Sequence, residues 1–238
     1  MTEWSMLADA CGSAGHVPAV LDRFEADVCG GWSELMDHLC PRLDTAFSAS
    51  FAALPRLAGL ASSRRGEERQ YVVQAAGAIV ACVVSGDDVF EDFSAPIAVL
   101  HRLVDESLHE TPGADSYVEL VQCLLAFEGV ERWDRCLEGL NAGEYEVDCP
   151  YCGVGLFIVL RDDACFAASG DYALREVATT PLRPSVPGEL AGLGERLYVR
   201  AVGDGQHRVA RGLTYLFGEG DCPDCGTGFS VADRVVGC

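Results

Sequence analysis

Apolar side chains recur every three or four residues through the first 147 positions of the chain. One stripe begins at Trp32 and returns at Leu35 and Leu39, the spacing that places side chains on one face of an α-helix. Stripes of this period cover residues 32–39, 72–83, 97–108, 117–124 and 130–140. Turn-forming residues separate the stripes, at Gly30-Gly31, 62–66, 85–88 and 111–113. The pattern therefore predicts a series of helices joined by short turns.

The pattern changes from residue 148 onward. Residues 156–160 form a short apolar, β-prone run that predicts a strand, and 171–177 are its candidate partner. Proline and glycine predict a loop over 179–194. A helical stripe follows over 195–217, which Gly203-Asp204-Gly205 could kink or split, and 229–232 predict a last short strand. We expect a mainly α protein, with an all-α domain over 1–145 and a small α+β module over 146–238.

Two near-identical segments, 148–155 and 221–228, carry the clearest chemical signal. Each reads Asp-Cys-Pro-x-Cys-Gly-x-Gly, so each places two thiols two residues apart. The glycine after the second cysteine permits a tight turn whose backbone N–H groups point at sulfur. Four thiolates can occupy the corners of one tetrahedron, as structural zinc requires. The predicted ligands of one structural Zn²⁺ are Cys149, Cys152, Cys222 and Cys225.

The repeated Cys-Pro-x-Cys-Gly knuckle resembles the zinc-ribbon family. The resemblance covers residues 147–158 and 220–232 and implies a ribbon in which the metal has a structural role. Residues 153–221 separate the two knuckles, far more chain than an ordinary ribbon contains. We therefore expect a ribbon interrupted by an insertion of helix and loop.

A second interpretation of the first knuckle is redox chemistry. Cys149-Pro150-Tyr151-Cys152 matches the redox motif of glutaredoxins, in which the motif opens a helix whose dipole lowers the thiol pKa. Here a Gly-Val-Gly segment and a strand-like run follow, and a sister motif exists. A catalytic zinc is disfavoured as well, because four cysteines leave no position for water. The sequence thus favours a protein that is not an enzyme, with a thiol-disulfide oxidoreductase as the alternative.

A weak repeat runs through the helical part. Segments that begin at Pro18, Pro55 and Pro96 are 37 and 41 residues apart, and helix pairs repeating at about 40 residues are typical of HEAT and armadillo solenoids. The stretch 49–57 resembles the short HEAT-like repeat proteins of bacteria. This resemblance implies stacked antiparallel helix pairs over about the first 130 residues, with a concave face that holds another protein. An irregular helical bundle would give nearly the same stripes, so both architectures stay open.

Charge limits the choice of partner. The chain has 37 acidic residues against 17 arginines and no lysine, a net charge of −20. Residues 1–147 hold 25 of the acids and 9 of the arginines, a net charge of −16. Such a field repels nucleic acid and anionic membranes and favours a basic partner, although solubility alone also explains it.

The remaining candidate residues are scattered. The five histidines show no i, i+4 pair, and we expect satisfied or surface side chains: His16, His38, His101, His109 and His207. A group of acids lacks the glycine and the closing glutamate of a calcium loop, which predicts a solvated loop: Asp87, Asp88, Glu91 and Asp92. Two cysteines are spare ligands without a paired neighbour: Cys165 and Cys238.

Six further cysteines stand singly, several on apolar helix faces, where we expect small buried hydrophobes: Cys11, Cys29, Cys40, Cys82, Cys123 and Cys136. The first residues show no basic region followed by an apolar run, and no stretch reaches the roughly 18 apolar residues of a membrane span. We expect no signal peptide, no membrane span and a cytoplasmic location, where thiols stay reduced.

These observations lead to one functional hypothesis and two rivals. We expect a non-enzymatic zinc protein of the adaptor or immunity type, whose acidic helical surface binds another, basic protein. The first rival is the oxidoreductase at Cys149 and Cys152. The second is a zinc ribbon associated with nucleic acid, which the net charge opposes. Four arginines near one helix face favour it: Arg196, Arg200, Arg208 and Arg211.

Overall fold

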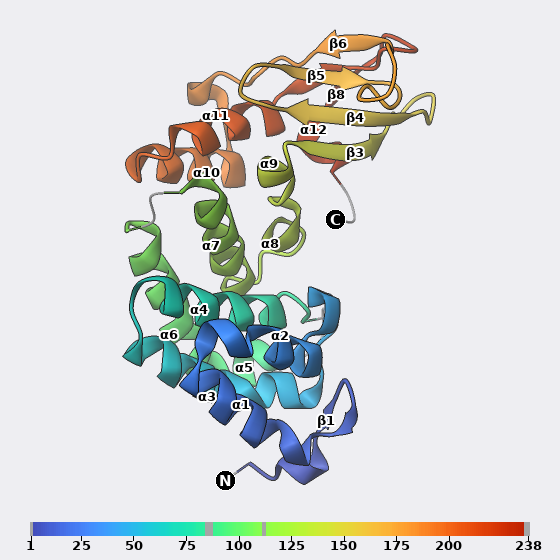
Figure 1. Cartoon of the computed structure of the whole chain (residues 1–238). Helices are drawn as coiled ribbons and strands as arrows, with labels where there is room; N and C mark the ends of the chain where they lie inside the picture. The colour runs from blue at the N-terminus through green and yellow to red at the C-terminus, as the bar shows by residue number, and fades with distance from the viewer. Residues whose placement is uncertain (1, 84–87, 111–112, 236–238) are drawn as a thin grey trace. The chain divides into compact units, whose positions relative to one another are not determined.

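A computed structural model describes residues 2–83, 88–110 and 113–235. The chain forms two compact units (Figure 1). Unit 1 comprises residues 1–111 and 119–134, and unit 2 comprises 112–118 and 135–238. The structure is mainly helical, with small antiparallel sheets, as the hydrophobic pattern predicts. None of the described helices is both long and apolar enough to cross a membrane.

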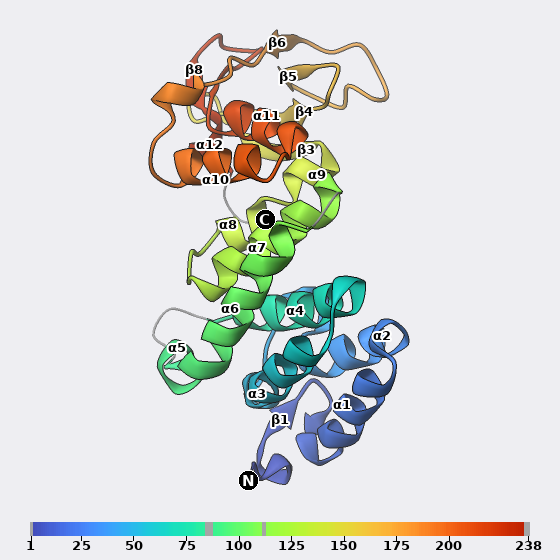
Figure 2. The ribbon, with the colours of Figure 1, turned by 90° about the vertical axis from the view of Figure 1, so that its left-hand side faces the viewer.

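Unit 1 is built from helices packed in neighbouring pairs. Helix α1 packs on α2 and α3 packs on α4, while α4 and α6 add further contacts to the same core. The strand β1 (Ala8–Asp9) lies against α3 (Figure 2). The bounds of the helices are α1 (Val17–Ala26), α2 (Val28–Leu39), α3 (Ser48–Ser63), α4 (Gly66–Val80), α5 (Val89–Asp92), α6 (Ser94–Leu108) and α7 (Ala114–Phe127). Many of the largest fully buried side chains come from the predicted stripes, among them Leu35, Ile79 and Leu100, whereas the equally buried Leu54 and Leu57 lie in α3, which no stripe covers.

The glycine pair predicted to break the chain lies inside a helix instead. Gly30 and Gly31 belong to α2, which begins just before them at Val28. The carboxylate of Asp27 caps this helix by accepting a hydrogen bond of 2.9 Å from the Gly30 N–H. A Cβ on Gly31 would lie 2.8 Å from the Cα of Phe24. The close approach of α1 to α2 therefore explains Gly31, whereas a Cβ on Gly30 would meet the capping side chain of Asp27. The predicted turn is wrong.

The proline repeat does not mark equivalent positions. Pro18 stands in the first turn of α1 and Pro96 near the start of α6, but Pro55 lies in the middle of α3. The fifth stripe, over 130–140, is not one helix: it gives the short helices α8 (Trp133–Cys136) and α9 (Gly139–Ala142). The predicted break at 62–66 is confirmed, because α3 ends at Ser63 and α4 begins at Gly66.

Unit 2 contains a four-stranded antiparallel sheet whose strands follow the order of the chain. The strands are β3 (Glu144–Asp148), β4 (Gly155–Leu160), β5 (Cys165–Ala168) and β6 (Thr179–Pro181), as Figure 1 shows. A second antiparallel pair consists of β7 (Glu219–Asp221) and β8 (Gly228–Ser230). Two helices lie between the sheets in sequence, α10 (Gly192–Gly203) and α11 (His207–Leu216), and α11 packs on β4, α9 and α10. The predicted split of the 195–217 stripe is confirmed, with Gly205 at φ +73° in the break.

The strand over 156–160 is confirmed as part of β4, but its predicted partner is wrong. Beta-strand pairing joins β4 to β3 and β5, whereas 171–177 contain no strand. The Asp171 carboxylate accepts hydrogen bonds from the N–H groups of Ala173 and Leu174, which turns the chain there. The Tyr172 ring then packs edge-on against two phenylalanines of the sheet, at 6.0 and 5.3 Å between ring centroids.

Two smaller differences between prediction and structure concern short elements of unit 2. Residues 179–181, predicted as loop, form the edge strand β6, where Pro181 lacks an N–H and is tolerated because the strand is at an edge. The predicted last strand, 229–232, ends at Ser230, and Val231 begins the short helix α12 (Val231–Arg234).

Candidate metal centre

The first knuckle is the turn between β3 and β4. The two strands close on the pair Asp148–Gly155. Inside the turn, the Cys149 N–H donates to the Val154 carbonyl at 2.9 Å and the Gly153 N–H donates to the Cys149 carbonyl at 3.1 Å. Gly153 has φ +72°, which residues with a Cβ rarely adopt. The local sequence thus fixes a turn that holds both thiols on one side.

The second knuckle, between β7 and β8, repeats this geometry residue by residue. The Cys222 N–H donates to the Thr227 carbonyl at 3.0 Å, and the Gly226 N–H donates to the Cys222 carbonyl at 2.8 Å. Gly226 has φ +69°. Two turns with the same sequence pattern therefore adopt the same backbone structure at opposite ends of a long insertion.

The insertion folds back so that the two knuckles meet. Its edge strand β6 and the residues that follow run beside β7: Arg183 and Glu219 exchange backbone hydrogen bonds of 2.8 and 2.9 Å. The Arg183 guanidinium also binds the Asp221 carboxylate, and the Thr180 hydroxyl donates to the Asp221 carbonyl. These contacts anchor the residue directly before Cys222 to the sheet that carries the first knuckle.

The four sulfur atoms lie within 4.8 Å of one another. Across the two knuckles, the sulfur atoms of Cys149 and Cys225 are 3.7 Å apart and those of Cys152 and Cys222 are 3.8 Å apart. A tetrahedral zinc with bonds of about 2.3 Å has sulfur–sulfur edges of about 3.8 Å. These cysteines are close enough to bind one metal ion, and both cross-knuckle distances match that tetrahedron.

The sulfurs differ in burial and in pKa. Cys149 and Cys222 are buried, and Cys152 and Cys225 are exposed. Hydrogen bonds from the backbone N–H groups of Cys152 and Tyr151 lower the pKa of Cys149 to about 6, and the hydroxyl and N–H of Thr227 lower the pKa of Cys225.

The other two thiols shift the opposite way. The Val154 N–H favours the thiolate of Cys152, but partial desolvation and hydrogen bonds with the neighbouring thiols outweigh it and raise the pKa of Cys152 to about 12. Burial raises the pKa of Cys222. Four negative charges cannot share so small a volume unless a cation compensates them. The cluster therefore has the electrostatics of a cation site.

The other cysteines have different surroundings. Cys165 lies apart from the cluster, with its sulfur 3.6 Å from the Arg211 guanidinium. Cys40 and Cys123 are buried as expected, whereas Cys11 and Cys29 are exposed, which corrects the expectation of buried hydrophobes. Cys136 is disulfide-bonded, contrary to the free thiol that we expected. Cys238, the other spare ligand, lies outside the described residues.

Two of the five histidines lie in a group of potential metal ligands that the sequence does not indicate. His16 and His38 come together with Asp9, a third residue that the pattern analysis missed. His101 lies 3.4 Å from Glu128, while His109 and His207 join no metal-binding group among the residues that the structure describes. Among the described residues, Asp88, Glu91 and Asp92 also belong to no metal-binding group. Asp87 lies outside the residues that the structure describes.

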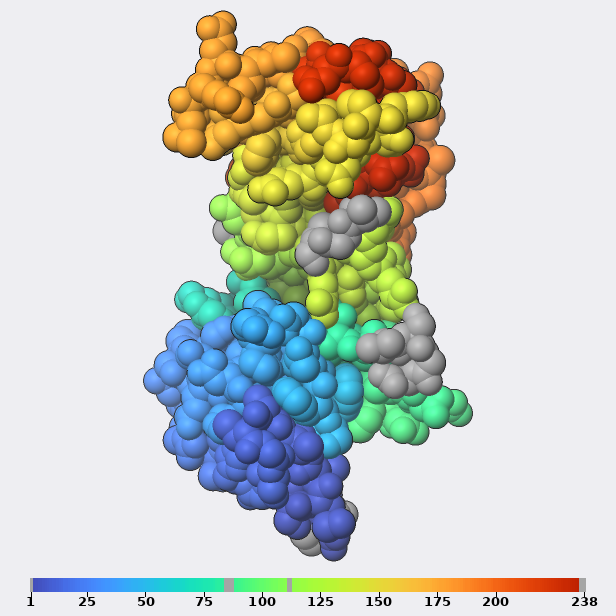
Figure 3. All heavy atoms as spheres, turned by 90° about the vertical axis from the view of Figure 1, so that its right-hand side faces the viewer, coloured from blue at the N-terminus to red at the C-terminus, as the bar shows by residue number. Residues whose placement is uncertain are grey.

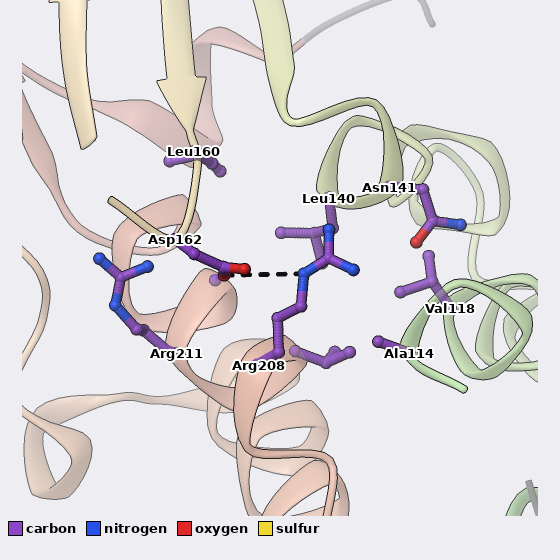
Figure 4. A pocket seen from close by; sticks show the side chains of 10 residues that line it. Ala114, Val118, Leu140, Asn141, Leu160, Asp162, Arg208 and Arg211 are labelled. Carbon is purple, nitrogen blue, oxygen red and sulfur yellow. Dashed lines mark ion pairs between the residues drawn. The ribbon is translucent and has the colours of Figure 1, made fainter. Parts of the chain in front are cut away.

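The arginines of α10 and α11 are engaged with protein groups. Arg208 lies 2.9 Å from Asp115 and 3.7 Å from Asp162, at a pocket between α11, α9 and the start of α7 (Figure 4). Arg211 donates to the Arg161 carbonyl at 3.1 Å, and Arg200 pairs with Asp204 at 3.0 Å. These three side chains therefore have partners within unit 2.

No protein-family model, curated protein or solved structure matches this chain. The geometry of its own residues is therefore the basis for a function.

Proposed function

We propose that this chain is a non-enzymatic zinc-binding interaction protein. A structural Zn²⁺ joins the two knuckles of unit 2, and the acidic surface of unit 1 binds a basic protein partner in the cytoplasm. The observation that carries the proposal is the set of four sulfurs at tetrahedral spacing, with cross-knuckle distances of 3.7 and 3.8 Å.

Zinc is the metal that fits this donor set. Four thiolates in a tetrahedron select zinc or an iron–sulfur centre over magnesium, calcium or manganese, which prefer oxygen ligands. The N–H groups that the two knuckles direct at sulfur supply the surrounding hydrogen bonds that such sites use to orient their ligands.

The proposed role of the metal is structural because the donor set is complete. Catalytic zinc keeps a coordination position for water, whereas four cysteines fill the tetrahedron. Two of the four come from β3–β4 and two from β7–β8, so the ion would cross-link two hairpins that the sequence separates widely. Its binding free energy then becomes folding free energy.

Native mass spectrometry of protein purified without chelator tests the zinc assignment. We expect Zn²⁺ bound at the thiolate site, with the four cysteines protected from alkylation until a chelator removes the ion. A chain that keeps its fold without metal at this site, and forms a reversible Cys149–Cys152 disulfide, would contradict the proposal and favour the thiol-disulfide oxidoreductase. The observation that favours this second candidate function is the lowered pKa of Cys149.

The charge of unit 1 supports the proposed partner chemistry. Its residues hold 21 acids and 8 arginines, a net charge of −13, against −7 for unit 2. Partial desolvation raises the pKa of the Cys29 thiol, and the negative charges of Glu67, Asp27 and Glu68 raise it further. Carboxylates at the start of α2 and of α4 thus lie near the same thiol. An adaptor or immunity-type protein with HEAT-like helix pairs would use the negative charge of unit 1 to hold a basic protein.

Affinity purification of the tagged chain from its own cells tests the interaction. We expect a basic protein that elutes as salt rises, because the contact is electrostatic. Glu67→Lys should weaken this binding. Glu176→Lys, an equal charge change at an exposed residue of unit 2, is the matched control. Binding that resists salt, or that both variants weaken alike, would refute the acidic-surface account.

The nucleic-acid alternative has less support. It requires a basic face on α10 and α11, and three of the four arginines there bind a carboxylate or a carbonyl of unit 2. A net charge of −20 adds repulsion from the phosphate backbone.

A further inference from the structure

Asp9, His16 and His38 form a second group of potential metal ligands, within unit 1. Asp9 ends β1 (Ala8–Asp9), and His16 ends the 3-10 helix (Ala14–His16) that leads into α1. His38 lies in the last turn of α2. The N-terminal segment is at the surface of unit 1, dark blue in Figure 3.

Backbone contacts hold the three residues in place. The hairpin of β1 and β2 (Gly12–Ser13) pairs Asp9 with Gly12. The Ala10 N–H donates to the His38 carbonyl at 3.1 Å, which ties the hairpin to the end of α2. The Ala8 N–H donates to the Ser48 hydroxyl at 2.9 Å, which ties it to α3. The cluster is therefore set by the folded backbone and not by mobile side chains alone.

Three ligand atoms of the cluster form a nearly equilateral triangle. Asp9 Oδ2 lies 2.9 Å from His16 Nε2 and 2.9 Å from His38 Nδ1, and the two nitrogens are 3.1 Å apart. The second carboxylate oxygen, Oδ1, accepts a hydrogen bond of 3.0 Å from the Cys11 N–H, which leaves Oδ2 directed at the two rings.

Protons cannot satisfy all three contacts at once. Each ring nitrogen carries at most one proton, and the carboxylate oxygen can only accept. If both nitrogens donate to Asp9, they face each other at 3.1 Å as two donors. If one nitrogen is unprotonated, a single proton must serve more than one contact. A cation at the centre satisfies all three lone pairs together.

The triangle has the size that a metal requires. Zinc binds nitrogen at about 2.0–2.1 Å and carboxylate oxygen at about 2.0–2.2 Å. A point about 2.1 Å from each corner lies about 1.2 Å above the plane of a triangle with 3 Å sides. Seen from that point the ligand atoms are roughly 90° apart, as on one face of an octahedron.

Charge and burial point to the same ligand. The Asp9 side chain is fully buried, whereas those of His38 and His16 are 20% and 43% exposed. The ion-pair partners that the structure gives this carboxylate within its described residues are the two imidazoles, not an arginine. A buried carboxylate needs a compensating charge, and a divalent cation held between the two rings supplies it.

We propose that Asp9, His16 and His38 bind a divalent transition-metal ion such as Zn²⁺ or Co²⁺. Two imidazoles and one carboxylate suit this class of metal and cover one face of it. Because three ligands leave coordination positions unfilled and the His16 ring is partly exposed, the ion can accept water or a donor atom from another molecule. This site is independent of the proposed thiolate centre.

Cobalt titration of the full chain tests this proposal, because Co²⁺ reports the type of its ligands. Cobalt bound by thiolates shows an intense charge-transfer band in the near ultraviolet, and cobalt bound by nitrogen and oxygen shows only weak visible bands. We expect two Co²⁺ per chain, one of each kind. His16→Ala should remove the second ion and leave the thiolate band. Cys225→Ser should remove the thiolate band and leave the second ion.

The controls separate this site from general histidine binding. His101→Ala removes another partly exposed histidine with one acidic neighbour in unit 1, and it should leave both ions in place. Asp9→Asn keeps the shape of the side chain, loses its charge, and should weaken Co²⁺ binding by at least the roughly 10–100-fold that loss of a supporting partner costs. Equal cobalt binding by the wild type, His16→Ala and Asp9→Asn would overturn the proposal. Absence of the thiolate band alone would instead refute the zinc assignment in unit 2.

Discussion

The two groups of ligands differ in donor atoms and in how the chain assembles them. The cysteine group consists of four like atoms from two copies of one local turn, and it encloses its centre completely. The group of Asp9, His16 and His38 consists of two nitrogens and one oxygen from a hairpin and two helices, and it covers only one side of its centre. A closed donor set suits a metal that holds structure, and an open one suits a metal that exchanges ligands.

Removing one cysteine ligand should have the largest effect. Cys222→Ser takes a buried thiolate from the closed group. Structural zinc binds with an apparent free energy of about 10–16 kcal/mol, which is also folding free energy, so we expect loss of the ion and of protease resistance in unit 2. Metal analysis and limited proteolysis check this.

Cys165→Ser is the matched control, because its sulfur belongs to the same unit but not to the cluster. If Cys222→Ser kept its metal and its resistance to protease, the closed group would not be a structural site.

Adding metal to the open group should have a smaller effect of opposite sign. With the thiolate site already filled, free Zn²⁺ at 100 times its dissociation constant should stabilise the folded state by about 2.7 kcal/mol. A thermal unfolding series at rising Zn²⁺ concentration measures this shift. His16→Ala should show no shift, and a shift that persists in this variant would place the added ion elsewhere.

Altering the turn of one knuckle should have the smallest effect. Gly153 has φ +72°, and a side chain there costs roughly 1–2 kcal/mol. Gly153→Ala should therefore weaken the thiolate site without abolishing it. Gly155→Ala is the control, because the added methyl group has open space around it, and it should leave the metal affinity of the thiolate site unchanged. Competition with a chromogenic chelator compares the two, and equal affinities would show that the left-handed turn is not needed.

The two groups also differ in how far the sequence predicts them. The cysteine group is predictable because each half is local: Cys-Pro-x-Cys-Gly fixes a turn and both thiols with it. That the halves meet depends on Arg183, Thr180 and Asp221, which no pattern indicates. Whether the bound ion is zinc stays a prediction.

No sequence pattern predicts the group of Asp9, His16 and His38. His16 and His38 are 22 residues apart and on different helical segments, and Asp9 joins them only because the N-terminal hairpin folds against the end of α2. The close approach of α1 and α2, which Gly31 permits, is likewise a tertiary effect: the same glycines suggest a turn when they are considered alone. Periodicity predicts α2, α4, α6 and α7, but it misses α1 and α3 and does not predict the contacts between helices.

The spacing of the knuckles also determines when the site can exist during synthesis. Cys222 follows Cys152 by 70 residues, which a ribosome adds in about 4–14 s at 5–20 residues per second. Throughout this interval the nascent chain offers two thiolates of the four. The second pair arrives after the sheet and both intervening helices have been translated. Tight metal capture would therefore mark the chains whose unit 2 is nearly complete, and a chain that stops early would hold the ion by half of its ligands.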